Sequence, residues 1–496
     1  MIAPSFVEFE KLSREENLIP LFKEIPGDLD TPLSAFLKID DGRSSFLLES
    51  VEGGERWARY SVLGSQPRMV IRWKDDLAEV STGDTSRTIG GVSDPTGLIK
   101  EIMAAYRPAV LAGLPKFFGG AVGFLSYDVA RKFERLPDLQ KPGPGFHDAV
   151  FMLTRDVVIF DNLSHKILLV TTVSTEEFSS VKQAYEDGRA RLKDLEERMT
   201  GPACRPGRVA RPLQPIEFSS NMTPGEFEEM VREAKSFITA GDVIQVVLSQ
   251  RFKGTGIADP LDVYRGLRMI NPSPYMFFLR FGDEVLAGSS PEVMVRLRNG
   301  EAVVRPIAGT KPRGVNRAQD EDLERELLAD EKESAEHVML VDLARNDLGR
   351  IAEPGSVTVD AFKTVERYSH VMHIVSNVRA KPAKGYDAYD ILRATFPAGT
   401  LTGAPKIRAM EIIEQLEPGR RGPYGGCVGY FSYTGSMDMC ITIRTVTMKG
   451  NEMFFQAGAG IVADSIPERE YEETMKKAEA MRRALVLAES FQGRSL

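Results

Sequence analysis

Two pairs of glutamates stand three residues apart in two distant segments of this sequence. Glu333 and Glu336 form the first pair, and Glu470 and Glu473 form the second. On a helix, residues i and i+3 share a face, so both carboxylates of a pair would point the same way. Apolar residues follow each pair at helical spacing, which predicts helices with one buried side. Because buried carboxylates need a cation or hydrogen bonds, each pair is either part of a metal site or a solvated helix face.

Two such pairs in one chain favour the metal more than either pair does alone. Four carboxylates without clustered histidine or cysteine suit Mg²⁺, which binds one or two carboxylates together with an anionic substrate. Glycine-containing loops at 309–314, 399–406 and 458–460 could offer backbone N–H groups to an anion. No GxxxxGK[ST] motif is present, and no GxGxxG follows a strand, so nucleotide binding is not indicated.

An arginine and a histidine in strand-like runs are further candidates. Arg444 lies in an otherwise apolar run and is either an anion clamp or an ordinary exposed arginine. His373 lies in a run with alternating apolar residues. A single histidine in a strand is usually structural, although its near-neutral pKa also suits proton transfer.

The elements that position these residues divide into two regions. Thr223-Pro224-Gly225-Glu226 is a capping box that begins a helix, and Asn299-Gly300 predicts a β-hairpin. Residues 200–215 are rich in Pro, Gly and Arg and form a linker or a long loop, so we expect regions 1–215 and 216–496. Further strands are predicted at 46–50, 68–73, 149–160, 166–174, 243–252 and 276–281, with a three-strand meander at 427–433, 438–448 and 452–457, and further helices at 175–199, 260–270 and 468–491.

One internal similarity links the two regions. The segment GGAVGFLSY at 119–127 is similar to GGCVGYFSY at 425–433. The two copies are either equivalent strands that pack near each other or independent strand entries after a glycine turn, because no fixed-period repeat accompanies them.

The bulk composition limits the class of protein. The 496 residues carry a net charge of −8, and the basic residues are scattered, which argues against a nucleic-acid or anionic-membrane surface. The three cysteines, Cys204, Cys427 and Cys440, are too few and too widely spaced for a disulfide framework. Neither a signal-peptide pattern nor an 18-residue uncharged apolar run occurs. We therefore expect a cytoplasmic protein.

Eight segments together resemble the chorismate-utilising enzymes, in particular their anthranilate-forming members. The resemblance runs from Leu47 to Glu473 and implies an α+β fold, with mostly antiparallel sheets packed as a sandwich and helices outside. It also implies that chorismate and Mg²⁺ bind in a cleft. The segments are PIAGTKPRG (306–314), DEKESAEHVMLVDLARNDLGRI (330–351), ERYSHVMHIVS (366–376), FPAGTLTGAPK (396–406), YGGCVGYFS (424–432), ITIRT (441–445), QAGAGIV (456–462) and EYEET (470–474).

The resemblance also implies roles for individual residues. Glu336 and Glu473 would be the principal Mg²⁺ ligands, with Glu470 assisting, and Glu333 would be a proton donor. His373 and Thr400 match positions that the family uses near the chemistry. Substrate-binding positions implied in the same way are Gly309, Thr310, Tyr424, Arg444, Gly458, Ala459, Gly460 and Lys477.

Two positions discriminate between branches of the family. Gln245 stands where water-adding members have an activating lysine, and Ala308 stands where aminodeoxychorismate-forming members often have lysine. Ammonia is therefore the expected nucleophile, and anthranilate and pyruvate are the expected products. Because the chain has no amidotransferase triad, a separate glutamine amidotransferase subunit would supply the ammonia. The alternatives are an aminodeoxychorismate-forming subunit and a catalytically inactive regulatory subunit.

A regulatory site for tryptophan is implied by the same resemblance. Glu49 could pair with an α-ammonium group, Ser50 could hydrogen-bond, and a proline-rich turn could enclose an indole. Without the resemblance, these would be an ordinary strand end and an ordinary turn. The residues implied are Glu49, Ser50, Pro274, Tyr275, Met276, Gly429 and Tyr430.

Overall fold

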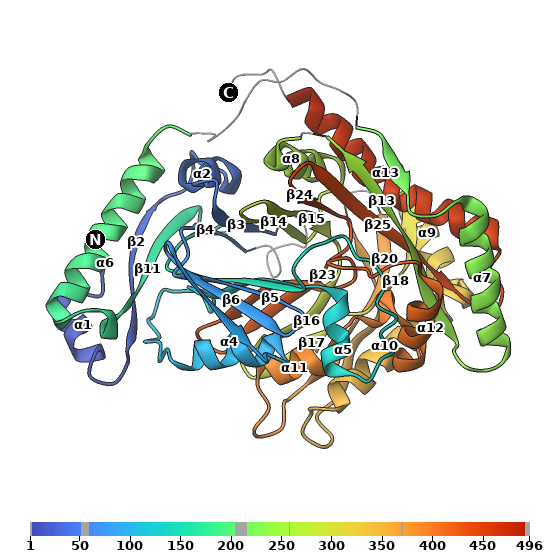
Figure 1. Cartoon of the computed structure of the whole chain (residues 1–496), viewed down its shortest axis with the longest axis horizontal. Coiled ribbons are helices and arrows are strands. Elements are labelled where there is room, and N and C mark those ends of the chain that lie inside the picture. The colour runs from blue at the N-terminus through green and yellow to red at the C-terminus, as the bar shows by residue number, and fades with distance from the viewer. Residues whose placement is uncertain (1, 51–58, 204–215, 257, 369–370, 492–496) are drawn as a thin grey trace.

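Two large antiparallel sheets make up the centre of the computed structural model, which describes residues 2–50, 59–203, 216–256, 258–368 and 371–491 (Figure 1). Most of the expected linker, residues 204–215, lies outside the described residues. The first sheet runs in the order β1 (Ile2–Ala3), β2 (Leu18–Pro26), β11 (Lys166–Ser174), β10 (Asp156–Asp161), β4 (Tyr60–Ser65), β3 (Ser44–Glu49), β14 (Tyr275–Phe281), β15 (Glu284–Ser290), β24 (Thr445–Lys449), β25 (Glu452–Ile461), β13 (Gln245–Thr255) and β12 (Phe218–Ser220), with β21 (Gly403–Ala404) beside β13.

The second sheet faces the first and is also built from both halves of the chain. Its order is β18 (Ile307–Pro312), β20 (Val371–Ala380), β17 (Glu301–Val304), β16 (Val293–Arg298), β23 (Met437–Ile441), β22 (Cys427–Ser432), β8 (Gly120–Leu125), β9 (Ala149–Leu153), β5 (Met69–Lys74), β6 (Leu77–Thr82) and β7 (Thr85–Gly90), with β19 (Thr358–Arg367) beside β20. Each sheet therefore joins strands from before and after residue 215.

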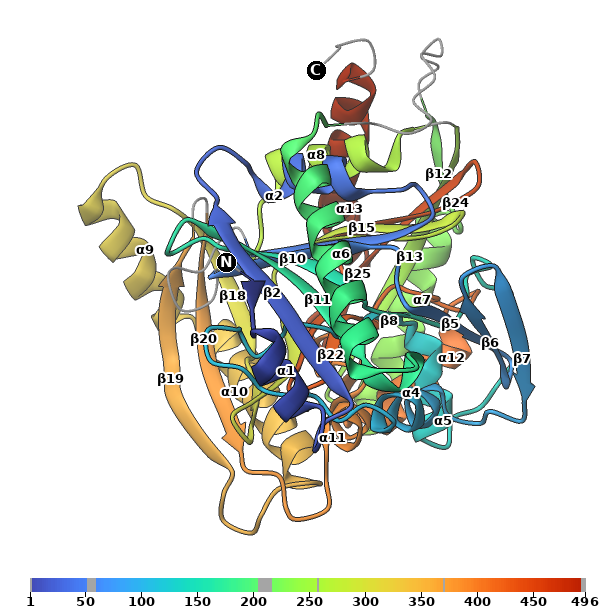
Figure 2. The same ribbon diagram turned by 90° about the vertical axis from the view of Figure 1, so that its left-hand side faces the viewer.

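Helices cover the outer faces of the sheets. Figure 1 places α6 at one end of the molecule and α7 and α13 at the other, and Figure 2 shows α6 lying along β2 and β11. The helices are α1 (Phe6–Leu12), α2 (Pro32–Ile39), α4 (Pro95–Ala104), α5 (Ala130–Phe133), α6 (Val181–Thr200), α7 (Pro224–Thr239), α8 (Pro260–Ile270), α9 (Arg317–Ala329), α10 (Glu331–Gly349), α11 (Ala388–Thr395), α12 (Lys406–Leu416) and α13 (Pro467–Phe491).

The alternation of side chains along β14 explains the sandwich. Phe277 and Leu279 point into the core between the two sheets, whereas Phe278 points to the opposite face and packs with Tyr264 of α8. Successive side chains of a strand face opposite sides, so a strand that is apolar throughout must be covered on both faces. This arrangement confirms the predicted α+β sandwich with helices outside.

Local signals in the sequence are confirmed where they depend on neighbouring residues. Thr223 and Glu226 form the predicted capping box at the start of α7. Asn299 and Gly300 have φ angles of 55° and 74°, as a two-residue hairpin between β16 and β17 requires. The acidic run from Arg317 divides into α9 and α10 at Asp330, whose carboxylate accepts the first free N–H groups of α10.

The internal similarity corresponds to two strands that pair with each other. β8 and β22 run antiparallel with Gly123 opposite Gly429, which confirms the interpretation as equivalent, adjacent strands. A Cβ at either glycine would lie 2.0 Å from a carbonyl oxygen of the next strand. The same close backbone approach therefore requires glycine in both copies.

Two predicted continuous strands are wrong, because the chain changes sheets within them. The run 149–160 divides into β9 in the second sheet and β10 in the first. The run 438–448 divides in the same way into β23 and β24, so the predicted three-strand meander does not form. Arg444 lies at this second crossing in a left-handed conformation, with φ of 50°, rather than inside a strand. Apolar periodicity indicates a strand but not the sheet to which it belongs.

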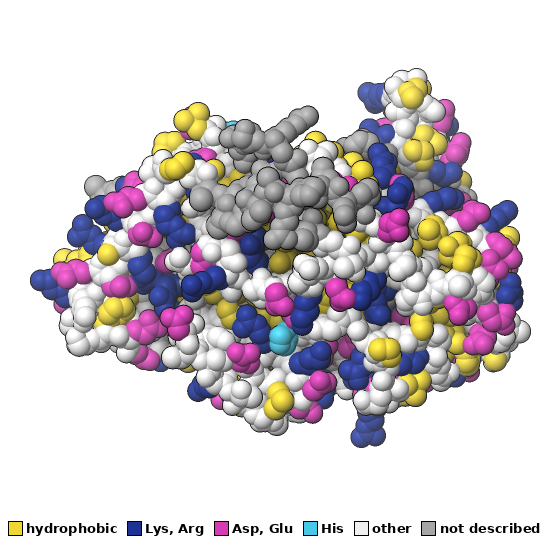
Figure 3. Space-filling view, turned by 45° about the horizontal axis from the view of Figure 1, so that its top comes forward, with side chains coloured by type: hydrophobic (Ala, Val, Ile, Leu, Met, Phe, Trp, Pro, Cys, Tyr) yellow, Lys and Arg dark blue, Asp and Glu magenta, His cyan; other side chains and the backbone are white. Residues whose placement is uncertain are grey.

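Charged side chains of both signs are intermixed on the face shown in Figure 3. None of the helices in the described part of the chain combines the length and apolar character needed to cross a membrane.

Candidate active site

The first glutamate pair lies where α10 packs against β18 and β20. Asp330 caps α10 by accepting the N–H groups of Lys332 and Glu333 at 3.0 and 3.1 Å. The carboxylate of Glu333 lies beside Gly309, because a Cβ on that glycine would be 3.2 Å from Glu333 Oε2. Gly309 has φ of 68°, which favours glycine. The helix therefore directs Glu333 at the predicted substrate loop.

The second glutamate pair lies on the first turns of α13, next to the glycine segment of β25. Lys477 connects the two elements, since its Nζ lies 2.7 Å from Glu473 Oε1 and donates to the carbonyl oxygen of Gly458 at 2.9 Å. Ala459, between the two glycines, is fully buried. The structure therefore brings the predicted positions 458–460, 473 and 477 together.

The two acidic pairs interact electrostatically. Burial raises the pKa of Glu333, and the negative charges of Glu336 and Glu473 raise it further. Burial also raises the pKa of Glu470, and the neighbouring charge of Glu473 adds to this effect. Among the described residues, no group of three or more acidic, histidine or cysteine side chains converges as a complete set of metal ligands. A hard cation would therefore take further oxygen ligands from a substrate or water, as Mg²⁺ commonly does.

Gln245 lies between the first acidic pair and the glycine segment. Its amide nitrogen donates to Glu336 Oε1 at 3.4 Å, and a Cβ on Gly460 would lie 2.6 Å from the same nitrogen. A neutral amide thus occupies the position where a lysine would act as a base on water. The carboxamide can hold Glu336 in place but cannot deprotonate a nucleophile.

His373 contacts the loop that carries Gly309 and Thr310. Its Nδ1 lies 3.0 Å from the carbonyl oxygen of Gly309 and 3.0 Å from the hydroxyl of Thr310. A carbonyl can only accept, so Nδ1 carries the proton and the neutral ring has its lone pair on Nε2. Burial lowers the pKa of His373, and the positive charge of Arg444 acts in the same direction. The histidine can therefore act as a proton acceptor at neutral pH.

Arg444 supplies a positive charge to the site and lies close to Tyr424. Burial lowers the pKa of Arg444, and within the described residues its guanidinium makes no hydrogen bond or ion pair. The Tyr424 hydroxyl lies against β25, because a Cβ on Gly458 would be 2.9 Å from it. The half-buried guanidinium without a protein partner is suited to bind a carboxylate, because a charge that is partly removed from water is stabilised by an anion.

Glu292 is a candidate catalytic residue that the sequence analysis missed. It accepts a hydrogen bond of 3.0 Å from the hydroxyl of Thr400, and burial raises its pKa to about 8. Both residues line a cavity of about 30 Å³ that Asp347 also borders. The available signal was an acidic residue directly after Pro291, between two apolar strands. A protonated carboxyl group beside Thr400 can donate a proton at neutral pH.

A separate cavity of about 730 Å³ lies between the two sheets at the predicted regulatory site. Six of the seven predicted residues line it, namely Glu49, Ser50, Tyr275, Met276, Gly429 and Tyr430, and Pro274 lines a small adjoining cavity with Ser50 and Tyr275. Glu49 already pairs with Arg268 at 3.3 Å and accepts a hydrogen bond from Tyr264. The cavity has the size of a small-molecule site.

The comparisons with known proteins agree with this architecture. Residues 54–483 match the model of the chorismate binding enzymes, and the chain belongs to that family. Within it, the chain is 46% identical to anthranilate synthase component 1 of Aquifex aeolicus (strain VF5), covering 98% of this chain and 99% of the relative. The Pseudomonas aeruginosa protein of the same name is 48% identical over 97% and 98% of the two chains. A crystal structure of anthranilate synthase component I from Streptococcus pneumoniae TIGR4 superposes with a TM-score of 0.76 at 37% identity, over 92% of this chain and 98% of that one. The predicted resemblance and fold class are confirmed.

Proposed function

We propose that this chain is an anthranilate synthase component I, which converts chorismate and ammonia to anthranilate, pyruvate and water. The observation that carries the proposal is the placement of a half-buried Arg444 without a protein partner and of two acidic helix starts around one glycine segment, 458–460. Chorismate has two carboxylates, so its site needs a direct cation for one and a metal-mediated contact for the other. The relatives that match over nearly the whole chain support the same activity.

The substrate would be held from two sides. Arg444 would bind the enolpyruvyl carboxylate, and Tyr424 and the backbone of Gly458–Gly460 would form the wall beside it. Glu336 and Glu473, assisted by Glu470, would hold Mg²⁺, which when bound supplies positive charge for the ring carboxylate. Lys477 keeps Glu473 close to Gly458 and so fixes one side of this arrangement.

The reaction needs an acid for the departing C4 hydroxyl and a base for the C2 proton. Ammonia adds at C2 while the C4 hydroxyl leaves, and protonation of that hydroxyl turns it into water. Glu292, protonated at neutral pH and bonded to Thr400, would supply this proton. Glu333 is the other candidate donor, because burial raises its pKa as well. His373 Nε2 would then accept the C2 proton as the enolpyruvyl group leaves, which makes the ring aromatic, and the departing enolate takes up a proton from solvent to become pyruvate.

The ammonia would come from a glutamine amidotransferase subunit. Gln245 and Ala308 leave the site without a lysine at the two positions that mark other branches of the family. Water then has no lysine at either position to activate it, which favours ammonia as the nucleophile. Ammonium salts at high concentration should replace the partner.

The test is an assay of the purified chain with chorismate, ammonium sulfate and MgCl₂. We expect a fluorescent anthranilate product that disappears when Mg²⁺ is chelated, and loss of turnover in Glu336→Gln with folding retained. A non-aromatic amino product alone would point to an aminodeoxychorismate-forming subunit. Chorismate binding without any turnover would point to an inactive regulatory subunit.

The cavity between the sheets is the proposed site of feedback inhibition by tryptophan. Tyr275 and Met276 would contact the indole, and Glu49 would contact the α-ammonium group. With tryptophan bound, the Glu49 carboxylate would contact both the α-ammonium group and Arg268, with which it is paired in the structure. Isothermal titration with tryptophan, with alanine as control, tests the assignment.

A further inference from the structure

A buried ion pair lies behind the proposed substrate site and is not part of the chemistry assigned above. Arg421 and Glu417 have side chains that are 1% and 4% exposed. The Arg421 Nε donates to Glu417 Oε2 at 2.9 Å, and Nη2 donates to Oε1 at 2.6 Å. Such a two-point contact fixes the plane of the guanidinium.

The remaining donors of Arg421 reach two other segments. Its Nη1 donates to the carbonyl oxygen of Leu401 at 2.6 Å, and Nη2 donates to that of Val247 at 2.7 Å. Leu401 directly follows Thr400, and Val247 is paired with Gly460 in the first sheet. The Arg421 side chain thus binds both the loop that carries Thr400 and strand β13, which pairs with the glycine segment.

Glu417 holds the same strand at its next inward-facing residue. Its Oε1 accepts hydrogen bonds from the backbone N–H of Ser249 at 2.9 Å and from its hydroxyl at 2.7 Å. Ser249 is paired with Gly458, just as Val247 is paired with Gly460. The two ends of the glycine segment therefore lie opposite the two residues that Arg421 and Glu417 hold.

The guanidinium also contacts two aromatic rings. It lies 4.6 Å from the ring centre of Tyr127 and 5.7 Å from that of Tyr424. Tyr424 is the residue whose hydroxyl reaches Gly458. Cation–π contact at these distances adds to the hydrogen bonds and fixes the ring of Tyr424.

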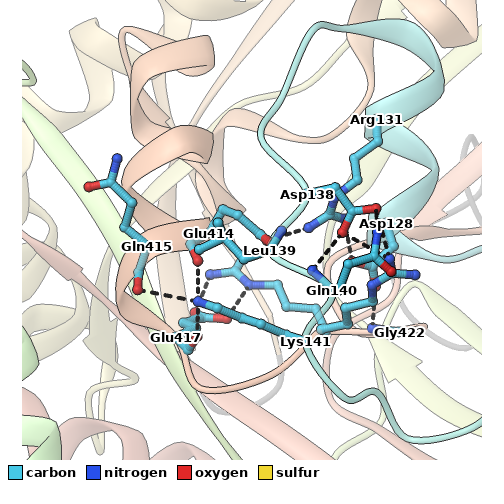
Figure 4. Close-up of polar contacts among 12 residues, drawn as sticks. Asp128, Arg131, Asp138, Leu139, Gln140, Lys141, Glu414, Gln415, Glu417 and Gly422 are labelled. Carbon is cyan, nitrogen blue, oxygen red and sulfur yellow. Dashed lines mark hydrogen bonds and ion pairs between the residues drawn. The ribbon is translucent and has the colours of Figure 1, made fainter.

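A second group of polar contacts lies next to the Arg421–Glu417 pair, around the carboxyl end of α12. Figure 4 shows Lys141 at the carboxyl end of α12, where it donates to the carbonyl oxygen of Glu417 at 2.6 Å. Arg131 binds Asp128 at 2.6 Å and also pairs with Glu414, and Asp128 accepts the N–H of Gly422 at 2.7 Å. Arg131 is therefore a partly buried arginine whose hydrogen-bond partners are two carboxylates rather than Leu401, Val247 or Glu417.

We propose that Arg421, anchored by Glu417, is a positioning residue that aligns Tyr424, the Thr400 loop and the strand opposite Gly458–Gly460 for substrate binding. The proposal deepens the function proposed above and rests on it for the identity of the substrate. Arginine is required because its planar fork meets a carboxylate and two carbonyl groups at once, whereas lysine presents a single charged nitrogen.

The test compares Arg421→Lys with the matched control Arg131→Lys in the full chain. We expect Arg421→Lys to raise the KM for chorismate at least about tenfold and to lower kcat, while the KM for ammonium stays within about twofold. Arg131→Lys, which removes an arginine that bridges two carboxylates and is 13% exposed, should leave both KM values near those of the wild type. Hydrogen exchange should be faster in Arg421→Lys at residues 245–249 and 399–404, and unchanged there in the control.

Two results would overturn the proposal. Kinetic constants and exchange rates of Arg421→Lys that match the wild type would show that the alignment does not need arginine. Equal losses in both variants, in proportion to their losses in melting temperature, would show a general effect on stability. Where Arg421→Lys does not fold, Glu417→Gln takes its place, with the same expected split between the two KM values. The exchange measurement needs no turnover, so its outcome is distinct from failure of the proposed function.

Discussion

The hydroxyl of Thr400 donates a hydrogen bond of 3.0 Å to the carboxyl group of Glu292, and both residues line one cavity of about 30 Å³. The pKa of Glu292, about 8, is above the usual glutamate value of 4.5 because burial disfavours the charged form. The group is therefore protonated at neutral pH, where the proposed reaction needs an acid.

Replacing Glu292 by Gln should abolish catalysis but not folding, since the amide keeps the shape and the contact with Thr400 without a transferable proton. In the wild type, kcat should fall as pH rises above about 8. Between pH 4.5 and about 8, Glu292 is protonated in the folded state and ionised in the unfolded state. The contribution of Glu292 to the free energy of unfolding therefore falls as pH rises through this range. The slope is at most about 1.4 kcal/mol per pH unit.

The stability of Glu292→Gln relative to the wild type should therefore increase from pH 5 to pH 8. Urea unfolding at several pH values measures this difference. A difference in unfolding free energy between variant and wild type that does not change with pH would contradict the assignment of Glu292 as a buried acid. An unchanged kcat in the variant would contradict it as well.

Replacing His373 by Asn should separate the two halves of the proposed reaction. The Asn amide can still donate to the carbonyl oxygen of Gly309, but it cannot accept the C2 proton. Anthranilate formation should fall by about 10²-fold or more, in the range of lost general-base catalysis, while chorismate consumption continues. Chromatography of the products measures both rates, and an equal fall in the two would place His373 in binding instead.

Much of this site follows from local sequence, and the rest depends on contacts between distant segments. The glutamate pairs were recognisable because i, i+3 spacing and following apolar residues are local signals. Glu292 was missed because a single glutamate after a proline carries no such pattern, and its altered pKa arises only from burial. The conformation of Arg444 was also missed, since the crossing between sheets at 442–444 has the composition of a strand.

Replacing Gly458 by Ala should damage the proposed substrate site. The new Cβ would lie 2.9 Å from the Tyr424 hydroxyl and 2.8 Å from the carbonyl oxygen of Leu248. We expect a loss of about 1–3 kcal/mol in stability, as for overpacked sites, and a higher KM for chorismate. Gly225→Ala is the control, because nothing lies within 4 Å of its Cβ position. Normal kinetics in Gly458→Ala would mean that Tyr424 does not contribute to the site.

Replacing Ser50 by Phe should weaken tryptophan inhibition without lowering kcat by more than about twofold. The Ser50 hydroxyl donates to the carbonyl oxygen of Pro274 at 2.9 Å, at the border of the two adjoining cavities. A phenyl group there would occupy the space proposed for the indole. Inhibition curves measure the effect, and an unchanged inhibition constant would place the tryptophan site elsewhere.

Lys406 and Asp347 connect the helix of the first glutamate pair with the loop of Thr400. The Lys406 Nζ lies 2.7 Å from Asp347 Oδ2 and donates to the carbonyl oxygen of Thr395 at 3.0 Å. The Lys406 side chain is 8% exposed and that of Asp347 13%. Asp347 lies near the carboxyl end of α10 and Lys406 begins α12, so the contact joins the two helices.

Removing one partner of the Lys406–Asp347 pair should lower the free energy of unfolding more than removing both partners does. Lys406→Met leaves a nearly buried carboxylate unpaired, and we expect it to destabilise the chain by about 3–5 kcal/mol. Asp347→Leu combined with Lys406→Met should recover a large part of that loss, since neither charge is then left without a partner. Urea unfolding of the wild type, the two single variants and the double variant gives the coupling energy. Additive losses would contradict a direct interaction and leave α10 and α12 joined by apolar packing alone.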